Sequence, residues 1–491
     1  MSEESLDSVS AGSGSGGLTR GELLKGAAVG AGLLGMGGLV SAGGAGAATR
    51  RAHGAVGARA VKRGGNLQVG LGGGGAADTL DAHLVRSTVD VIRHNALYDQ
   101  LTQVNHSFDL VYRLATEITS NKKGDLWTVR LRKGVEFHDG KTLDAEDAIF
   151  SIRRILTLPG STGAGQLFAV DYKNMRKIDK LTFQIPTKIP FSTLVNSLGD
   201  GSTNFIVPVG YDPNKPVGTG PFMYESFSPG QRSVFKRNPN YWDTPAYLDT
   251  LTLIDLTDDT ARMNALTTGA VQVIDDVPTD EVAVIKGNSK LKLLVSPTGG
   301  FSPIYMRTDK PPFSDNRVRQ AMRLILNRPQ AVEHAMGGYG RVGNDLVSPY
   351  DPGYLPKLHR VQDLEKAKSL LKQAGHENLS VVLNTSPVTP STVPGTEVLA
   401  QNASEIGVKI TLHQIDPGTL YGKNFLSWDF AVDWYPALSY IDESSLLTAG
   451  KIASTNLAHF NDPTYNKLFM QALAELNATK RNDIIHEMEM I

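Results

Sequence analysis

The sequence contains no cysteine. This absence excludes disulfides, cysteine-ligated zinc, iron–sulfur clusters, a cysteine nucleophile and a lipid-modified N-terminal cysteine. An excess of charge of one sign is also missing, because 49 Lys and Arg stand against 50 Asp and Glu. Nucleic-acid-binding proteins usually carry a basic excess or a basic stripe, so we expect no nucleic-acid partner.

Motifs of common enzymes are missing as well. The sequence has no G-x-S-x-G elbow and no H-E-x-x-H motif, and its histidines show no zinc-site spacing. The run from Gly70 to Gly75 satisfies G-x-G-x-x-G, but Thr79-Leu80-Asp81 interrupts any helix that would open there. We therefore expect no cofactor, no metal and no catalytic residue. Composition alone leaves a carboxylate-pair glycosidase open, because Asp and Glu are abundant.

The first 64 residues differ in composition from the rest. Residues 1–18 are rich in Ser, Gly and acidic groups and are predicted to be disordered. Arg20 and Lys25 then precede 24 uncharged residues, and Ala45-Gly46-Ala47 supplies a small-residue cleavage site. This pattern predicts a signal peptide over residues 19–48 and a linker over residues 49–64. An uncleaved anchor is the alternative. Gly21 replaces the second arginine of a twin-arginine signal, so Tat-like and Sec export both stay open.

The length of 491 residues predicts two or three domains or lobes, because it exceeds one ordinary hydrophobic core. Strand-like alternation and helix-like spacing of apolar residues follow one another along the chain. Strands are predicted at residues 66–71, 127–131, 181–186, 222–227, 233–237, 251–256, 271–274, 380–384 and 409–414. Helices are predicted at residues 85–101, 145–156 (with Asp144 as N-cap), 257–268, 317–326, 363–374, 395–406, 462–474 and 481–490. This alternation predicts a mixed α/β architecture. No run of 18 or more apolar residues follows the N-terminal segment, so we expect the body of the chain to lie outside the membrane.

Several blocks of the sequence resemble one family. They are Gly64-Gly65-Asn66-Leu67-Gln68-Val69-Gly70, Tyr98-Asp99-Gln100-Leu101, Gly134-Val135-Glu136-Phe137-His138-Asp139-Gly140, Gly218-Thr219-Gly220-Pro221-Phe222, Arg237-Asn238-Pro239-Asn240-Tyr241-Trp242 and Pro312-Phe313-Ser314-Asp315-Asn316-Arg317-Val318-Arg319-Gln320-Ala321. In this order and spacing they are similar to the large solute-binding proteins of peptide/nickel-type ABC importers (family 5, oligopeptide/dipeptide-binding-like). The similarity runs from about Gly64 to the C-terminus.

The resemblance implies a two-lobed α/β fold of the periplasmic-binding-protein type (class II, large cluster C). Such a fold has an extra subdomain in the first lobe and a ligand cleft between the lobes. The implied first lobe covers residues 65–296, with the subdomain at about residues 105–200, and the second lobe covers residues 297–480. Residues 481–491 would begin the return to the first lobe. The sequence stops inside a predicted helix there, which we interpret as a truncated end.

The resemblance also places the solute site at residues 72–78, 298–305 and 433–443. The candidate ligand-binding residues in these stretches are aromatic or acidic: Trp434, Tyr435, Asp433, Tyr440, Asp442, Phe301, Tyr305 and Asp78. Phe168, in the stretch at residues 160–172, is a further candidate. Aromatic and acidic groups together suit a ligand with apolar surface and a cationic or hydrogen-bonding end.

The function implied by the resemblance is solute capture for transport, without enzymatic activity. We expect an exported monomer in the periplasmic space, or at the outer face of the cytoplasmic membrane, that is not a lipoprotein. It would capture a peptide or similar small solute by lobe closure and deliver it to the permease and ATPase subunits of an ABC importer. An oligosaccharide or a metal chelate stays open as the solute. The alternative function is a secreted hydrolase or a solute-sensing module on a similar scaffold.

Overall fold

The structure is a computed structural model that describes residues 62–105, 109–199 and 202–491. All described residues belong to one compact unit. The predicted disordered segment and signal peptide (residues 1–18 and 19–48) lie outside the described residues, as does the predicted linker up to residue 61.

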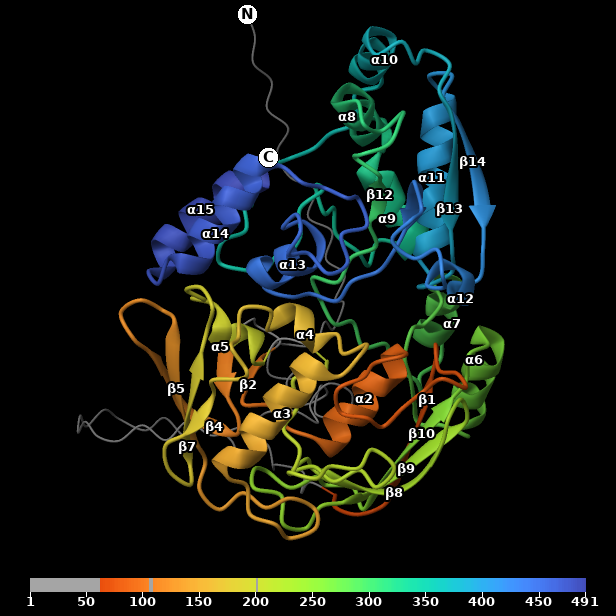
Figure 1. Cartoon of the computed structure of the whole chain (residues 1–491). Coiled ribbons are helices and arrows are strands. Elements are labelled where there is room, and N and C mark those ends of the chain that lie inside the picture. Colours follow the sequence, from red (N-terminus) through yellow and green to blue (C-terminus); the bar gives the residue numbers. More distant parts are fainter. Residues whose placement is uncertain (1–61, 106–108, 200–201) are drawn as a thin grey trace, which may run out of the picture. The chain divides into compact units, whose positions relative to one another are not determined.

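A five-stranded sheet contains the first strand of the described chain (Figure 1). Its order is β11-β1-β10-β9-β8, with β1 parallel to β10 and β11, and β9 antiparallel to β8 and β10. The bounds are β1 Asn66–Leu71, β8 Phe222–Ser228, β9 Arg232–Arg237, β10 Thr250–Asp255 and β11 Val273–Ile274. The helices α2 (Thr88–Leu97), α6 (Asp259–Thr268) and α7 (Val282–Gly287) belong to the same stretch of chain, with a short 3-10 turn at Thr279–Glu281. The predicted first strand and the predicted hairpin are confirmed.

Asp99 joins three of the sequence blocks that resemble the solute-binding family. Its Oδ1 accepts hydrogen bonds from Arg113 Nη2 (3.0 Å) and the Tyr241 hydroxyl (3.2 Å). Its Oδ2 accepts hydrogen bonds from Thr219 Oγ1 (3.0 Å) and Trp242 Nε1 (2.8 Å). A buried carboxylate is tolerated when it is paired and fully hydrogen-bonded in this way. These blocks therefore stabilise the scaffold.

Two antiparallel sheets follow in the region that the sequence assigned to an extra subdomain. The pair β2–β3 consists of Thr102–Val104 and Leu110–Tyr112. The order β4-β5-β7-β6 is built from Ala115–Ser120, Leu126–Leu131, Thr182–Pro186 and Arg176–Lys177. The helices are α3 (Ala145–Thr157), α4 (Gly163–Gln166) and α5 (Leu194–Ser197). Asp144 is the N-cap of α3, as predicted, and forms a reciprocal capping box with Asp147.

One hydrophobic core joins this region to the end of the described chain. Buried residues between positions 101 and 206, such as Phe183, share it with buried residues between positions 440 and 488, such as Phe469. The latter come from α13 (Tyr440–Leu447), α14 (Pro463–Ala474) and α15 (Ala478–Met490). Each large apolar side chain that is fully buried contributes about 1.5–3 kcal/mol. Apolar packing therefore holds these two distant segments together.

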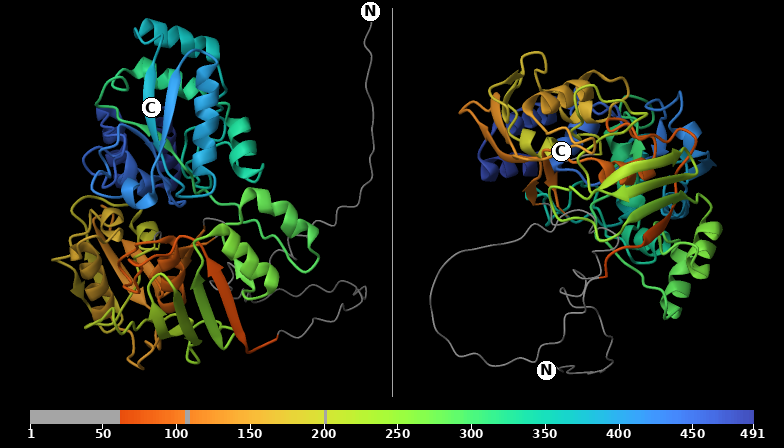
Figure 2. Two further views of the ribbon diagram at one scale, coloured as in Figure 1. Left: turned by 90° about the vertical axis from the view of Figure 1, so that its right-hand side faces the viewer. Right: turned by 90° about the horizontal axis from the view of Figure 1, so that it is seen from below.

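A fourth sheet has the order β12-β15-β13-β14 and its own core. Its strands are β12 Ile304–Met306, β15 Phe430–Val432, β13 Ser380–Thr385 and β14 Lys409–Gln414. The helices of this region are α8 (Asn316–Ile325), α9 (Arg328–Met336), α10 (Leu364–Gln373), α11 (Thr392–Ser404) and α12 (Pro417–Leu420). The long helix α11 packs on β13 and β14 (Figures 1 and 2). β13 and β14 are parallel, and α11 supplies the crossover connection that parallel neighbours need.

Glycines occupy two kinds of backbone position, those with a left-handed conformation and those where the chain passes close to other backbone. Gly134 and Gly140 have φ values of 79° and 85°, in the left-handed region that favours glycine. A Cβ on Gly218 or Gly220 would clash with the backbone of Leu97 at the end of α2. These last two glycines therefore allow the chain to pass directly against that helix.

The strands of the five-stranded sheet fall within residues 66–274, and those of the sheet β12-β15-β13-β14 fall within residues 304–432. The lobe boundaries at residues 65–296 and 297–480, with the subdomain at about residues 105–200, stay predictions. None of the helices in the described part of the chain is long and apolar enough to cross a membrane.

Candidate functional site

The ladder between β12 and β15 continues beyond both strands into the predicted site. Its register pairs Tyr305 with Ala431, and the same register brings Phe301 opposite Tyr435. Phe301 and Tyr435 exchange two backbone N–H···O hydrogen bonds, each of 3.0 Å. Their rings stack with centroids 5.8 Å apart at an angle of 28°. Two stretches that the sequence analysis placed in one site are therefore direct neighbours.

Strand alternation determines which side chains share a face of this ladder. Phe301 and Tyr305 are four residues apart on one side of the ladder. On the other side Tyr435 lies opposite Phe301, and Asp433 lies two residues from Tyr435, so all four side chains point to one face. Trp434 points to the opposite face and is partly buried. The edge of its indole lies 3.6 Å from the position that a Cβ on Gly300 would take. The indole edge therefore lies directly beside the backbone at Gly300.

Asp433 holds the aromatic residues of the ladder in place. Its Oδ1 accepts hydrogen bonds from the Tyr421 hydroxyl and from the backbone N–H of Trp434, both at 2.7 Å. Its Oδ2 accepts a hydrogen bond from the Tyr435 hydroxyl at 2.9 Å. The residue is 2% exposed. Burial raises the pKa of Asp433, although the hydrogen bonds from Tyr421, Trp434 and Tyr435 oppose this effect. Its carboxylate is an internal acceptor for this aromatic group.

The hydroxyl of Tyr305 lies beside this group without a hydrogen-bond partner among the described residues. Tyr305 is 8% exposed, and burial followed by the nearby charge of Asp433 raises the pKa of its hydroxyl. A buried hydroxyl that lacks a partner costs about 1–3 kcal/mol. It is the polar atom of this cluster with unused hydrogen-bonding capacity.

Tyr440 and Asp442 begin the next helix, α13, and both are buried. The Tyr440 backbone N–H donates to Asp351 Oδ2 at 2.9 Å, and its hydroxyl lies 3.3 Å from that of Tyr465. The carboxylate of Asp442 accepts hydrogen bonds from Ser197 and Ser439. Both residues take part in contacts between helices.

Asp78 lies in a different environment, next to α2 and the first sheet. Its Oδ2 is 2.8 Å from Arg93 Nη1, and both side chains are almost completely buried. Burial would raise the pKa of Asp78, but hydrogen bonds from Arg93 and Ser87 lower it below its ordinary value. The Asp78 carboxylate is therefore the counter-ion of a buried arginine.

Phe168, the remaining candidate, packs between two other phenylalanines. Its ring lies 5.5 Å from that of Phe191 and 6.4 Å from that of Phe469. It belongs to the rim of the hydrophobic core that joins α4 and α14. The structure thus brings Phe301, Tyr305, Asp433, Trp434 and Tyr435 together, while the other candidates occupy separate places. The role of all nine as solute ligands stays a prediction.

Two residues near these candidates were missed from the sequence. Tyr421 donates to Asp433 from the end of α12, and Ser197 donates to Asp442 from the end of α5. Neither hydroxyl belongs to a recognisable pattern. Only the fold brings them to the carboxylates, so no local signal in the sequence could have identified them.

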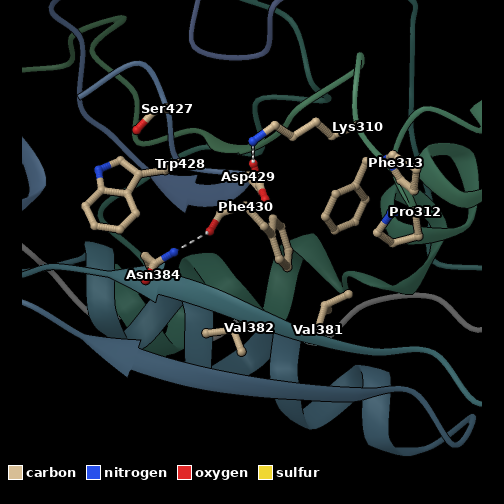
Figure 3. A pocket seen from close by; sticks show the side chains of 11 residues that line it. Lys310, Pro312, Phe313, Val381, Val382, Asn384, Ser427, Trp428, Asp429 and Phe430 are labelled. Atoms are coloured by element: carbon tan, nitrogen blue, oxygen red, sulfur yellow. Dashed lines mark hydrogen bonds and ion pairs between the residues drawn. The ribbon is translucent and has the colours of Figure 1, made fainter. Parts of the chain in front are cut away.

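A pocket of about 330 Å³ lies between β13 and β15 (Figure 3). These strands pair only at Asn384 and Ala431, and they diverge from there. Trp428, Phe430, Val381 and the ion pair between Lys310 and Asp429 (2.8 Å) line the opening (Figure 3). None of the predicted solute ligands lines it.

The glycine run after β1 packs against acidic side chains. The Gly72 N–H donates to Asp275 Oδ1 at 2.9 Å, and a Cβ on Gly74 would lie 2.7 Å from the carboxyl carbon of Asp255. The next helix begins only at Thr88. Carboxylates at these positions would repel a dinucleotide phosphate. Within the described residues, no group of three or more His, Asp or Glu side chains is placed to hold a metal ion.

The sheets and helices define a mixed α/β fold of the two-lobed solute-binding class. DppA from Helicobacter pylori, solved in complex with the peptide STSA, superimposes with a TM-score of 0.75 and 22% identity, covering 87% of this chain and 90% of that one. NikZ from Campylobacter jejuni, solved in complex with Ni(L-His), gives a TM-score of 0.74 and 17% identity over 86% and 89% of the two chains.

The profile of "Bacterial extracellular solute-binding proteins, family 5 Middle" matches residues 109–449. The chain therefore belongs to the family 5 bacterial extracellular solute-binding proteins, as the sequence blocks indicated. The glutathione-binding protein GsiB of Escherichia coli (strain K12) is 28% identical over 355 residues, which is 69% of this chain and 68% of the relative. The matched region includes the ladder of Phe301 and Tyr435 and the start of α13.

Proposed function

We propose that this chain is the extracytoplasmic solute-binding component of an ABC importer and that it captures a peptide or similar small solute without altering it. The observation that carries this proposal is the family match over residues 109–449, which spans the whole predicted aromatic site. The proposal includes export across the cytoplasmic membrane, a monomeric state and delivery of the solute to a membrane permease.

The aromatic cluster supports a solute with both apolar and hydrogen-bonding groups. The stacked rings of Phe301 and Tyr435 offer apolar surface on one face of the ladder, and the Tyr305 hydroxyl on that face offers a donor and acceptor without a partner among the described residues. The Trp434 indole offers apolar surface on the opposite face. Sites for small solutes usually combine such surface with a few fixed polar groups. Asp433 keeps the Tyr435 ring in position by accepting a hydrogen bond from its hydroxyl, and it also accepts one from the Trp434 backbone N–H.

Peptides are the solute class that we place first. The relative GsiB is named for glutathione, and DppA was solved with the peptide STSA. Extended peptides offer regularly spaced N–H and C=O groups, which suit a site at the end of a strand ladder. A metal chelate is the second solute class to be tested, because NikZ was solved with Ni(L-His).

Differential scanning fluorimetry with four probes tests this function: glutathione, the tetrapeptide Ser-Thr-Ser-Ala, nickel with L-histidine, and a maltooligosaccharide. A bound solute stabilises the folded state by about 2.7 kcal/mol at a concentration of 100 times Kd, so the melting temperature should rise and saturate with one probe class. Chromatography of the same mixture should recover that probe unchanged. If no probe raises the melting temperature and one of them is consumed, the secreted hydrolase is the better account.

A further inference from the structure

The start of α13 is joined to α5 by a carboxylate that lies inside the protein. Asp442 is 1% exposed, and its Oδ1 accepts a hydrogen bond from Ser197 Oγ at 2.6 Å. Its Oδ2 accepts a hydrogen bond from Ser439 Oγ, also at 2.6 Å. Ser439 is the N-cap of the helix that contains Asp442, whereas Ser197 lies 245 positions before Asp442 in the chain. One carboxylate thus binds its own helix and a distant one.

The Ser197 side of this contact is held rigidly. Ser197 is completely buried, and its carbonyl oxygen accepts a hydrogen bond from Asn204 Nδ2 at 2.6 Å. Asn204 Nδ2 also donates to Gln166 Oε1 at 3.1 Å, which ties α5 to α4. These hydrogen bonds fix the end of α5 in the position from which the Ser197 hydroxyl donates to Asp442.

Further contacts surround this carboxylate on both sides. A Cβ on Gly165, in α4, would lie 3.2 Å from Leu446 Cδ2 and 3.4 Å from Ser454 Cβ. Ser192 donates its N–H to the Leu473 carbonyl at 2.8 Å and its hydroxyl to the Ala472 carbonyl at 3.1 Å. The segment from α4 to α5 and the segment from α13 to α14 therefore meet along a continuous seam, in which polar bonds of defined geometry lie beside the hydrophobic core that the two segments share in this form.

We propose that Asp442 is a positioning residue for solute capture, and that its bond to Ser197 is a latch between the two segments that join when a solute is enclosed. This inference rests on the proposed function, because a solute can enter and leave only if the protein opens. The predicted lobe boundary places Ser197 and Asp442 on opposite sides of that opening. Asp442 then sets the equilibrium between the open and the closed form, and it does not touch the solute.

The two serines provide a matched pair of variants. Ser197→Ala removes the bond that crosses the seam, and Ser439→Ala removes a bond of equal length to the same carboxylate within one segment. A hydrogen bond to a charged group is worth about a tenfold change in an equilibrium or more. Ser197→Ala should therefore reduce the closed population about tenfold, whereas Ser439→Ala should lower the melting temperature and leave that population unchanged.

Disulfide trapping measures the closed population directly, because the chain has no cysteine of its own. The double variant Gly165→Cys with Ser454→Cys would place the two Cβ atoms 3.4 Å apart, close to the usual disulfide separation of about 3.5–4.5 Å. The solute-free protein is predicted to be mostly open, so its rate of cross-linking reports the closed fraction. Ser197→Ala should slow cross-linking about tenfold, and Ser439→Ala should not slow it. Small-angle X-ray scattering should show a smaller radius of gyration after cross-linking in every background.

An unchanged cross-linking rate in Ser197→Ala, with the same radius of gyration before and after cross-linking, would overturn the latch. That result would mean that the seam is a permanent core contact. The fluorimetry panel separates this failure from failure of the proposed function. If a probe stabilises the protein saturably while the radius of gyration of the protein stays unchanged, only the latch is contradicted. If the latch works but the protein consumes its solute, only the transport function is contradicted.

Discussion

Arg93 and Asp255 form a buried ion pair in which Arg93 Nη2 lies 2.7 and 2.8 Å from the two carboxylate oxygens. Neither side chain is exposed, and Arg93 Nη1 also pairs with Asp78 at 2.8 Å and with Asp90 at 3.0 Å. One guanidinium thus holds three carboxylates that come from the loop after β1, from α2 and from β10. This cluster anchors the glycine run to the first sheet.

Replacing the arginine should strongly destabilise the protein. Arg93→Met leaves three buried carboxylates without their common counter-ion, which is expected to cost about 3–5 kcal/mol in the free energy of unfolding. Urea titration followed by circular dichroism measures this loss. The control is Arg130→Met, because Arg130 pairs with Glu117 at 3.6 Å on the surface, with both side chains more than half exposed. It should cost less than about 1 kcal/mol, and equal losses in the two variants would refute the role of burial.

The indole of Trp434 should contribute directly to solute affinity. Trp434→Ala removes a large apolar surface at the aromatic site, and such a loss typically weakens binding by about 2 kcal/mol or more. Isothermal titration with the probe that stabilises the wild type measures the change. Trp428→Ala is the matched control, since Trp428 is also partly buried beside the sheet β12-β15-β13-β14 but lines the separate pocket between β13 and β15. Equal affinity losses would show that Trp434 acts only through the stability of this region.

Asp275 should make the stability depend on pH in the weakly acidic range. Burial, followed by the negative charge of Asp276, raises the pKa of Asp275 to about 6. A raised pKa favours the protonated acid in the folded state, so its contribution to stability is complete below the ordinary Asp pKa of about 3.9 and is lost as pH rises through about 6. Asp275→Asn should therefore stabilise the protein above pH 6 by about 1–2 kcal/mol and flatten this part of the pH profile.

Asp309 supplies a control of opposite sign for the same urea titrations. The hydrogen bond from Arg307 lowers the pKa of Asp309 to about 2, so its stabilising contribution is present above the ordinary Asp pKa and is lost as pH falls toward 2. Asp309→Asn should change the acidic limb of the profile and leave the region near pH 6 as in the wild type. A profile that Asp275→Asn does not alter would contradict the account of that residue.

The regular elements could be predicted because their signals are local. The alternation in β1 and the apolar spacing of α3 with Asp144 as its N-cap lie within short windows, and both elements were found at the expected residues. The strands β12 and β15 were missed, since three residues each are too few to show a period of two. Their pairing nevertheless positions the aromatic site.

The site could be predicted only in part, for a related reason. The family resemblance located the stretches around Phe301 and Tyr435, which the fold does bring together. It could not show that Asp433 is already bonded to Tyr421, or that Asp442 is bonded to Ser197. Both bonds depend on contacts that local patterning does not encode. The candidate acids were thus identified from residue type, while their bonding partners required the fold.

Native mass spectrometry of the wild-type protein after incubation with a defined peptide mixture tests the central claim most directly. Reversible solute capture predicts a complex with one bound peptide whose mass equals that of an intact component of the mixture, and the peptide should be released unchanged on dilution. A protein that shows no bound component while the mixture accumulates shorter peptides would contradict the account and would favour a hydrolase on this scaffold.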